Sequence, residues 1–210
     1  MKAVKPQAQS SGVPVLHEGE SASMSVEEYL RTEPTAPIRR EFDRGIAQAM
    51  SGGSPEHSLV KTELVYLLAS GLRDGNCTLF DSDMRVQVAD DQFVYPDASV
   101  VCDPPEYTGE GAMRSLANPL VVIEVLSASS EGYDRGDKFR KYFSMKSVRD
   151  YILVSQERPR VEVISQNEDG EHYQLRVFDG LDRTAVIPSL SFQIQLAEIY
   201  RTLSFSTDDD

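Results

Sequence analysis

The 210-residue chain contains no tryptophan, two cysteines and three histidines, and it has no long apolar run. Two cysteines are too few for a disulfide framework, and Cys77 and Cys102 lack zinc-site spacing, so we expect two reduced thiols. The histidines, His17, His57 and His172, are scattered, which excludes a histidine-based zinc cluster. No apolar run reaches about 18 residues and no charged-then-apolar leader is present, so we predict a cytoplasmic protein that does not engage a membrane.

Positive charge is also scarce, because 21 basic residues stand against 34 acidic ones, for a net charge of −13. In bulk, this charge repels nucleic acid. The sign inverts locally where Asp137 is the sole acid among six basic residues, namely Arg135, Lys138, Arg140, Lys141, Lys146 and Arg149. Such a cluster indicates either a solvated helix face or a surface for phosphates.

The length and the 40% hydrophobic content predict one domain, over residues 23–203. Residues 1–22 are rich in Gln, Ser, Gly and Ala, and residues 204–210 are acidic, so we expect both to be flexible tails.

Periodicity, caps and breakers predict an α/β or α+β domain with a mixed sheet. Pro96 implies an edge position or a bulge near Asp97. Helices are predicted over residues 25–31, 55–71 and 136–147, and strands over 39–50 (strand or hairpin), 84–89, 93–101, 119–126, 150–154, 160–165, 172–178 and 191–196.

The most informative residue is Glu124, which lies in the most apolar stretch of the chain, residues 119–126. In a strand covered on both faces, its carboxylate must be protonated, paired or bound to a cation. Asp97 offers a second acid on another strand, and Lys138 follows a turn rich in Ser, Gly and Asp. Mg²⁺ is typically held by one or two carboxylates while the ion retains several waters. An ammonium nearby can orient water or stabilise developing negative charge.

Each residue also has a plainer interpretation. Asp97 could be a turn acid, and Glu124 could pair with an arginine or accept backbone amides. Lys138 could be a surface lysine, with Lys141 one turn away as a competitor. Glu41 could pair with a neighbouring arginine, and His57 could be a half-buried histidine in a first helical turn.

Taken together, these residues form a specific pattern that resembles the Uma2 (DUF820) family of restriction-endonuclease-like proteins, in the PD-(D/E)XK nuclease superfamily. The resemblance runs from about residue 24 to 163. Its motifs are Tyr95-Pro-Asp97, Val122-Ile-Glu-Val-Leu-Ser127, Asp134, Asp137-Lys138, Tyr142, Asp150-Tyr-Ile-Leu-Val154, Arg40-Glu-Phe-Asp-Arg-Gly45 and Ser54-Pro-Glu-His57.

The resemblance implies a restriction-endonuclease-like mixed sheet flanked by helices, and Mg²⁺- or Mn²⁺-dependent cleavage of DNA. By position, Asp97 and Glu124 are similar to the metal-binding acids, and Glu41 and His57 to accessory polar residues. The third position of the tripeptide that begins with Glu124 is Leu126 instead of lysine, and Lys138 substitutes from the following helix. Basic groups beside this site, Arg135, Arg140 and Lys141, are the candidates for binding nucleic acid.

A second departure is Ser155, which stands where family members usually have aspartate. With the acidic net charge, it supports an alternative: a non-catalytic binding or assembly protein that keeps the nuclease fold. A small-molecule phosphoesterase is a third hypothesis. A homodimer is plausible for an enzyme that cuts two strands.

Overall fold

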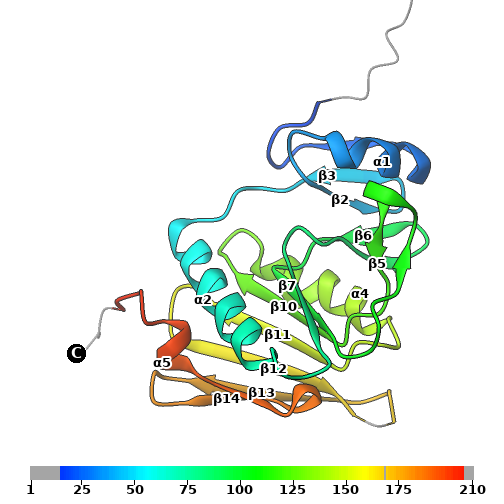
Figure 1. Cartoon of the computed structure of the whole chain (residues 1–210). Coiled ribbons are helices and arrows are strands. Elements are labelled where there is room, and N and C mark those ends of the chain that lie inside the picture. The colour runs from blue at the N-terminus through cyan, green and yellow to red at the C-terminus, as the bar shows by residue number, and fades with distance from the viewer. Residues whose placement is uncertain (1–14, 168, 206–210) are drawn as a thin grey trace, which may run out of the picture.

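The computed structural model describes residues 15–167 and 169–205 (Figure 1). Part of the predicted N-terminal tail is ordered, because Leu16 is buried and β1 (Ser21–Ser23) pairs with β3 (Ile46–Ala49). At the other end, the Phe205 ring packs edge-on against Tyr200, while residues 206–210 lie outside the described residues. No helix in the described ranges is both long and apolar enough to cross a membrane.

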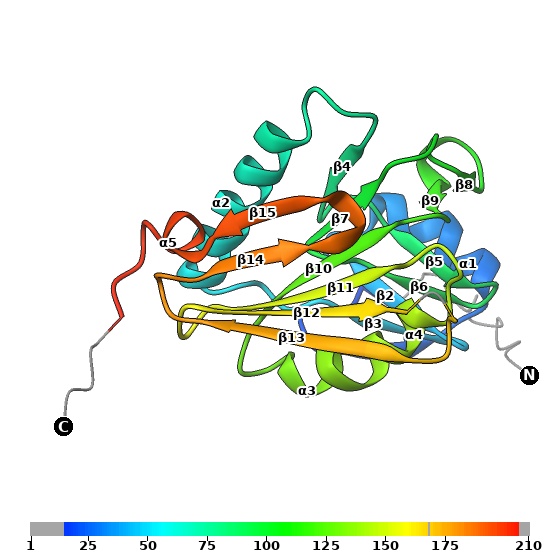
Figure 2. The same ribbon diagram turned by 90° about the horizontal axis from the view of Figure 1, so that it is seen from below.

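A six-stranded mixed sheet forms the centre of the molecule, as Figure 2 shows from below. Its two middle strands, β10 and β11, run parallel, and the other neighbours pair antiparallel. The strand order is β13 (Tyr173–Asp179), β12 (Arg160–Gln166), β11 (Asp150–Ser155), β10 (Val121–Leu126), β7 (Ala98–Val101) and β4 (Thr78–Asp81).

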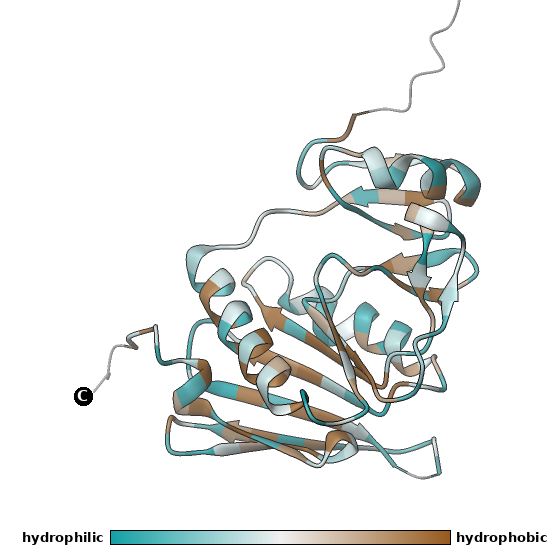
Figure 3. Cartoon of the chain, in the orientation of Figure 1, coloured by the Kyte–Doolittle hydropathy of each residue, from teal (hydrophilic) through white to brown (hydrophobic). Residues whose placement is uncertain are grey.

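The two faces of this sheet have different covers. One face packs against α2 (Pro55–Gly71), α5 (Leu196–Ile199) and the hairpin of β14 (Thr184–Ile187) and β15 (Phe192–Gln195). The other face packs against α4 (Phe139–Phe143), and we call it the α4 face. Figure 3 shows the apolar residues concentrated along the central strands. The predicted α+β class, with a mixed sheet flanked by helices, is confirmed.

A second sheet of seven short strands packs against the α4 face. The helix α1 (Val26–Thr32) packs against this second sheet. Its order is β1, β3, β2 (Arg40–Asp43), β6 (Gln92–Val94), β5 (Val86–Ala89), β9 (Ser115–Leu116) and β8 (Tyr107–Thr108). The remaining short turns of helix are η1 (Glu33–Thr35), α3 (Glu131–Tyr133), η3 (Asp134–Lys138), η2 (Gly111–Met113) and η4 (Pro188–Leu190).

Most predicted elements are confirmed, and the differences have physical reasons. The Ser25 and Ser54 side chains cap α1 and α2 as expected. The strand predicted over residues 93–101 is two strands, β6 and β7, in different sheets. Pro96, which has no N–H for a strand ladder, lies in the link between them. Five strands lie outside the predicted ranges, namely β1, β4, β8, β9 and β14.

The predicted helix over residues 136–147 begins earlier, at Glu131, and ends earlier, at Phe143. It contains a π-helical segment, η3, whose last residue is Lys138. Gly132 and the serines before it gave no helical signal, because glycine and serine are poor helix formers. Segments of π-helix are common at functional sites.

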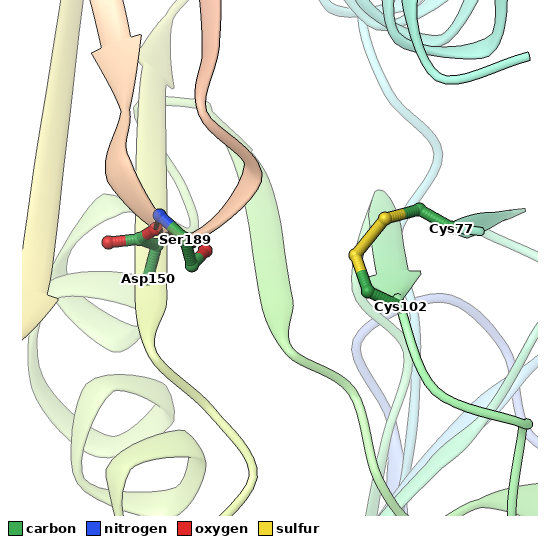
Figure 4. The surroundings of a disulfide bond; sticks show 4 residues. All are labelled: Cys77, Cys102, Asp150 and Ser189. Atoms are coloured by element: carbon green, nitrogen blue, oxygen red, sulfur yellow. Dashed lines mark hydrogen bonds between the residues drawn. A yellow bond between two sulfur atoms is a disulfide. The ribbon is translucent and has the colours of Figure 1, made fainter. Parts of the chain in front are cut away.

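The prediction of two reduced thiols is wrong, because Cys77 and Cys102 form a disulfide (Figure 4). Cys77 immediately precedes β4 and Cys102 immediately follows β7. These strands are antiparallel with Thr78 opposite Val101, so the next pair in register is the two cysteines. The same figure shows Asp150 beside Ser189, whose backbone N–H donates to the Asp150 carboxylate over 2.9 Å.

Candidate functional site

The first feature of the site is the register between β7 and β10. The ladder ends where Ile123 lies opposite Ala98, so Glu124 and Asp97 are the next residues beyond its last pair. Glu124 alternates with Val122 and Leu126 and therefore lies on the α4 face. Asp97 precedes the first residue of β7 and contacts α2, which covers the other face. The Val125 backbone N–H donates to Asp97 Oδ2 over 2.8 Å, which holds this aspartate against β10.

Glu124 is buried, with 5% of its side chain exposed. Its Oε1 accepts two hydrogen bonds of 2.9 Å, from the Lys138 ammonium and from the Tyr142 hydroxyl. Within the described residues, Oε2 accepts no hydrogen bond from the protein, so one oxygen is free to bind another group.

The Lys138 ammonium is shared among three acids. Beyond Glu124, its Nζ lies 3.2 Å from Glu41 Oε1 and 3.6 Å from Asp134 Oδ1. Asp134 Oδ1 is buried and has no hydrogen-bond partner among the described residues. Because one ammonium cannot neutralise three carboxylates, the cluster has a shortage of positive charge.

Asp97 has basic neighbours on α2. His57 Nε2 lies 3.2 Å from Asp97 Oδ2, and Lys61 Nζ lies 3.8 Å from Oδ1. His57 occupies the first turn of α2, which begins at Pro55 after the Ser54 cap, so the helix start aims it at the aspartate. The spacing of His57 and Lys61, four residues on one helix face, is a signal that could have found Lys61.

Glu41 reaches the site from β2 in the second sheet. Its Oε1 accepts the Tyr95 backbone N–H over 3.2 Å, and its Oε2 accepts the Tyr133 hydroxyl over 2.8 Å. Tyr133 in turn accepts from the Lys141 ammonium over 2.9 Å. Nothing in the sequence pattern singled out Tyr133.

The pKa shifts follow this charge arrangement. Burial, together with the charges of Asp134 and Asp97, raises the pKa of Glu124 well above its ordinary value, against the effect of Lys138. Burial works in the opposite sense on Lys138, but the surrounding carboxylates prevail and raise its pKa, so it stays protonated. For Asp97, burial is outweighed by His57, the Val125 amide and Lys61, and its pKa is lowered.

The Lys138 ammonium joins two of the predicted residues, Glu124 and Glu41, and His57 contacts a further one, Asp97. These two groups meet at β10, where the Val125 N–H next to Glu124 donates to Asp97. Lys138, and not Lys141, touches Glu124.

The three predicted nucleic-acid-binding residues all have acidic partners. The Arg135 guanidinium binds Glu162 and Glu131, and Arg140 pairs with Asp137 on the surface. Lys141 is buried, and its Nζ lies 2.9 Å from Asp43 Oδ2. Arg140, with 70% of its side chain exposed, is the most accessible of the three.

The donor set suits one kind of metal. Among the described residues, no three His, Cys, Asp or Glu side chains form a ready cage for an ion. Mg²⁺ needs no such cage, since one or two carboxylates hold it while it retains waters. The two carboxylates that could hold such an ion are Glu124, through its free oxygen, and Asp97.

Comparison with known proteins shows which family the chain belongs to. The fold is similar to that of "a putative nuclease belonging to DUF820" from Anabaena variabilis, with a TM-score of 0.65 and 23% identity, over 85% of this chain and 98% of that chain. The model of the Uma2 family, described as "Putative restriction endonuclease", matches residues 26–198. The chain belongs to the Uma2 family.

Two curated relatives come from Synechocystis sp. The protein slr1290 is 35% identical over 183 residues, which cover 87% of this chain and 94% of that protein. The protein sll1609 is 33% identical over 140 residues, which cover 66% of this chain and 78% of that protein.

Proposed function

We propose that this protein is a metal-dependent DNA endonuclease, in which Asp97 and Glu124 hold Mg²⁺ or Mn²⁺ and Lys138 assists the attacking water. The observation that carries the proposal is the shortage of positive charge in the cluster around Lys138, with Asp97 held against β10 by the N–H of Val125, the residue after Glu124. A divalent cation would relieve that shortage. Membership of the Uma2 family supports a nucleic-acid substrate.

Each residue would have a distinct role. A bound divalent cation polarises a phosphoryl oxygen and makes bound water more acidic. The Lys138 ammonium, 2.9 Å from Glu124 Oε1, is a positive charge that can orient water and stabilise the negative charge developing on a phosphodiester. Glu41 positions Lys138, and His57 positions Asp97, so these two act through the residues that they touch.

A plasmid-nicking assay with Mg²⁺ tests the proposal. We expect wild-type protein to nick supercoiled plasmid and Asp97→Ala to reduce the rate by at least about a hundredfold, because one ligand of the cation is gone. The matched control is Glu63→Gln. Glu63 is another buried acid, lies on α2 and pairs with Arg201, outside the cluster. Nicking that Asp97→Ala leaves unchanged would overturn the assignment.

The competing hypothesis is a non-catalytic binding or assembly protein with the same fold. It draws support from the acidic partners of Arg135, Arg140 and Lys141. Calorimetry with Mn²⁺ separates the two hypotheses. The metal site predicts saturable binding that Glu124→Ala abolishes, whereas a scaffold without that site gives no such heat.

A further inference from the structure

The edge strand β13 is unusual among the sheet edges of the described residues. It has seven residues, whereas the opposite edge, β4, has four and is fastened by the disulfide beside it. The edges of the second sheet, β1 and β8, have three and two residues. Natural sheets usually keep edges short or protect them with lysine, proline or a bulge, because open edges pair with other strands. The sequence of β13, YQLRVFD, contains neither lysine nor proline.

The backbone groups available on β13 follow from the hydrogen bonds at its two ends. Asn167 N–H donates to His172 C=O, and Gly180 N–H donates to Pro159 C=O. In an antiparallel ladder, the groups of alternate residues point to the same side. Even-numbered residues of β13 therefore face β12, and Tyr173, Leu175 and Val177 direct their N–H and C=O groups toward the open edge.

The same three residues carry exposed apolar side chains. Tyr173, Leu175 and Val177 are 41%, 55% and 40% exposed, and they share the α4 face. The Tyr173 ring rests on Phe143, with 4.5 Å between ring centroids, so one end of this stripe is already ordered. Lone exposed apolar residues are ordinary, but a row of three along an open edge marks an interaction surface.

We propose that β13 pairs with β13 of a second copy of this chain, antiparallel and centred on Leu175. This register is self-complementary. Leu175 lies opposite Leu175 of the partner subunit, and Tyr173 lies opposite Val177 of the partner subunit, so the three apolar residues meet one another. On the other face, Gln174 lies opposite the partner's Arg176, a pair that already bonds within one chain over 2.6 Å.

The three outward-facing positions of each strand become hydrogen-bonded pairs in this register. Each pair exchanges two N–H···O bonds, so the seam contains about six backbone hydrogen bonds. Two-fold symmetry gives the closed, isologous contact that is commonest among homo-oligomers.

The pairing would continue the six-stranded sheet of one copy into the other. The α4 faces of both copies then lie on the same side of the joined sheet, because residues opposed across an antiparallel seam share a face. Seven strand spacings separate the two β10 strands, or about 34 Å at the usual inter-strand distance.

Sedimentation velocity of the full chain over a range of concentrations tests the proposal. We expect wild-type protein to shift from monomer to dimer, and Leu175→Lys to raise the dissociation constant at least about tenfold, because two introduced ammonium groups face each other across the axis. Leu181→Lys is the matched control, since Leu181 is 48% exposed but lies outside β13. A wild-type chain that stays monomeric, or a dimer that Leu175→Lys leaves intact, would overturn the proposal.

Disulfide trapping tests the register independently. Opposed residues of a hydrogen-bonded pair have Cα atoms about 5.5 Å apart, within the range of a disulfide. With oxidised glutathione as the oxidant, we expect Leu175→Cys to form a covalent dimer on a non-reducing gel. Val177→Cys alone should not, because its opposite residue is the partner's Tyr173. Equal trapping of both variants, or of neither, would overturn the register.

Discussion

Two buried glutamates lie in one row across the central sheet, and their surroundings differ. Glu124 on β10 is opposite Leu153 on β11, and Leu153 is opposite Glu162 on β12. Each of the two side chains is 5% exposed. They share a face and a small exposed fraction, but Glu124 lies deeper in the protein and the two differ in their partners.

Glu162 is fully paired. The Arg135 guanidinium binds it through two hydrogen bonds of 2.7 and 3.0 Å, and Arg160 adds a third of 2.8 Å. Among the described residues, the one cation beside Glu124 is Lys138, which is shared with Glu41 and Asp134, and the other donor to Glu124 is the neutral Tyr142 hydroxyl. The comparison teaches that a buried acid is not itself a sign of function, since Glu162 is explained by its arginines. The sign is the unmet need for positive charge around Glu124.

The largest effect in this comparison is expected from Lys138→Met. Removing the sole ammonium leaves three carboxylates facing one another, and breaking a buried ion pair typically costs about 3–5 kcal/mol. We expect the free energy of unfolding in urea to fall by that amount in EDTA. Millimolar Mn²⁺ should restore more stability to the variant than to the wild type, because the cation replaces the missing charge. A variant as stable as wild type in EDTA would contradict this account.

Glu162→Gln should have a smaller effect and spare the metal site. The variant loses charge-assisted hydrogen bonds to two guanidiniums, so we expect a loss of about 2 kcal/mol in the free energy of unfolding. Calorimetric binding of Mn²⁺ should match wild type. A Glu162→Gln protein that no longer binds Mn²⁺ would show that the two clusters are not separate.

The two glutamates should also make opposite contributions to the pH dependence of stability. The Arg135 hydrogen bonds lower the pKa of Glu162, so its contribution is present above pH 4.5 and lost as pH falls through the folded pKa. Burial raises the pKa of Glu124, so its contribution is present below pH 4.5 and lost as pH rises through the folded pKa.

Urea unfolding in EDTA at several pH values measures both contributions. The destabilisation caused by Glu162→Gln should shrink as the pH falls below 4.5. Glu124→Gln should instead gain stability relative to wild type as the pH rises from 4.5. Parallel slopes for the two variants would contradict the charge assignment.

The contrast between the glutamates also explains what could be predicted from the sequence. Glu124 stands out because every neighbour in its strand is apolar, and Ser54-Pro55 announces the helix that carries His57. These signals are local in the sequence. The structures that they predict, a buried strand around Glu124 and a helix that begins at Pro55, are confirmed. The proximity of Asp97 to β10, where it accepts the Val125 N–H, is a tertiary contact that the resemblance led us to expect.

The partners could not be predicted, because they come from distant segments. Arg135 donates to Glu162, which lies 27 residues further along the chain, and Glu41 accepts from Tyr133, which lies 92 residues further along. The disulfide depends on the register of β4 and β7, which neither strand encodes alone. The local excess of basic residues between Arg135 and Arg149 is a count along the chain, whereas Arg135, Lys138 and Lys141 pair with acids from distant segments.

The smallest expected effect concerns the second hydrogen bond to Glu124. Tyr142→Phe keeps the buried ring and removes only the hydroxyl that donates to Oε1, so the free energy of unfolding should fall by about 1 kcal/mol. Tyr151→Phe is the matched control, because its hydroxyl donates over 3.0 Å to the Asp134 backbone carbonyl instead of a carboxylate. The two variants should be equally destabilised. They should differ in Mn²⁺ affinity, which Tyr142→Phe alone lowers about tenfold, since groups that orient a ligand carboxylate tune its metal affinity. Equal Mn²⁺ affinities of the two variants in calorimetry would show that the Tyr142 hydroxyl does not orient Glu124 for metal binding.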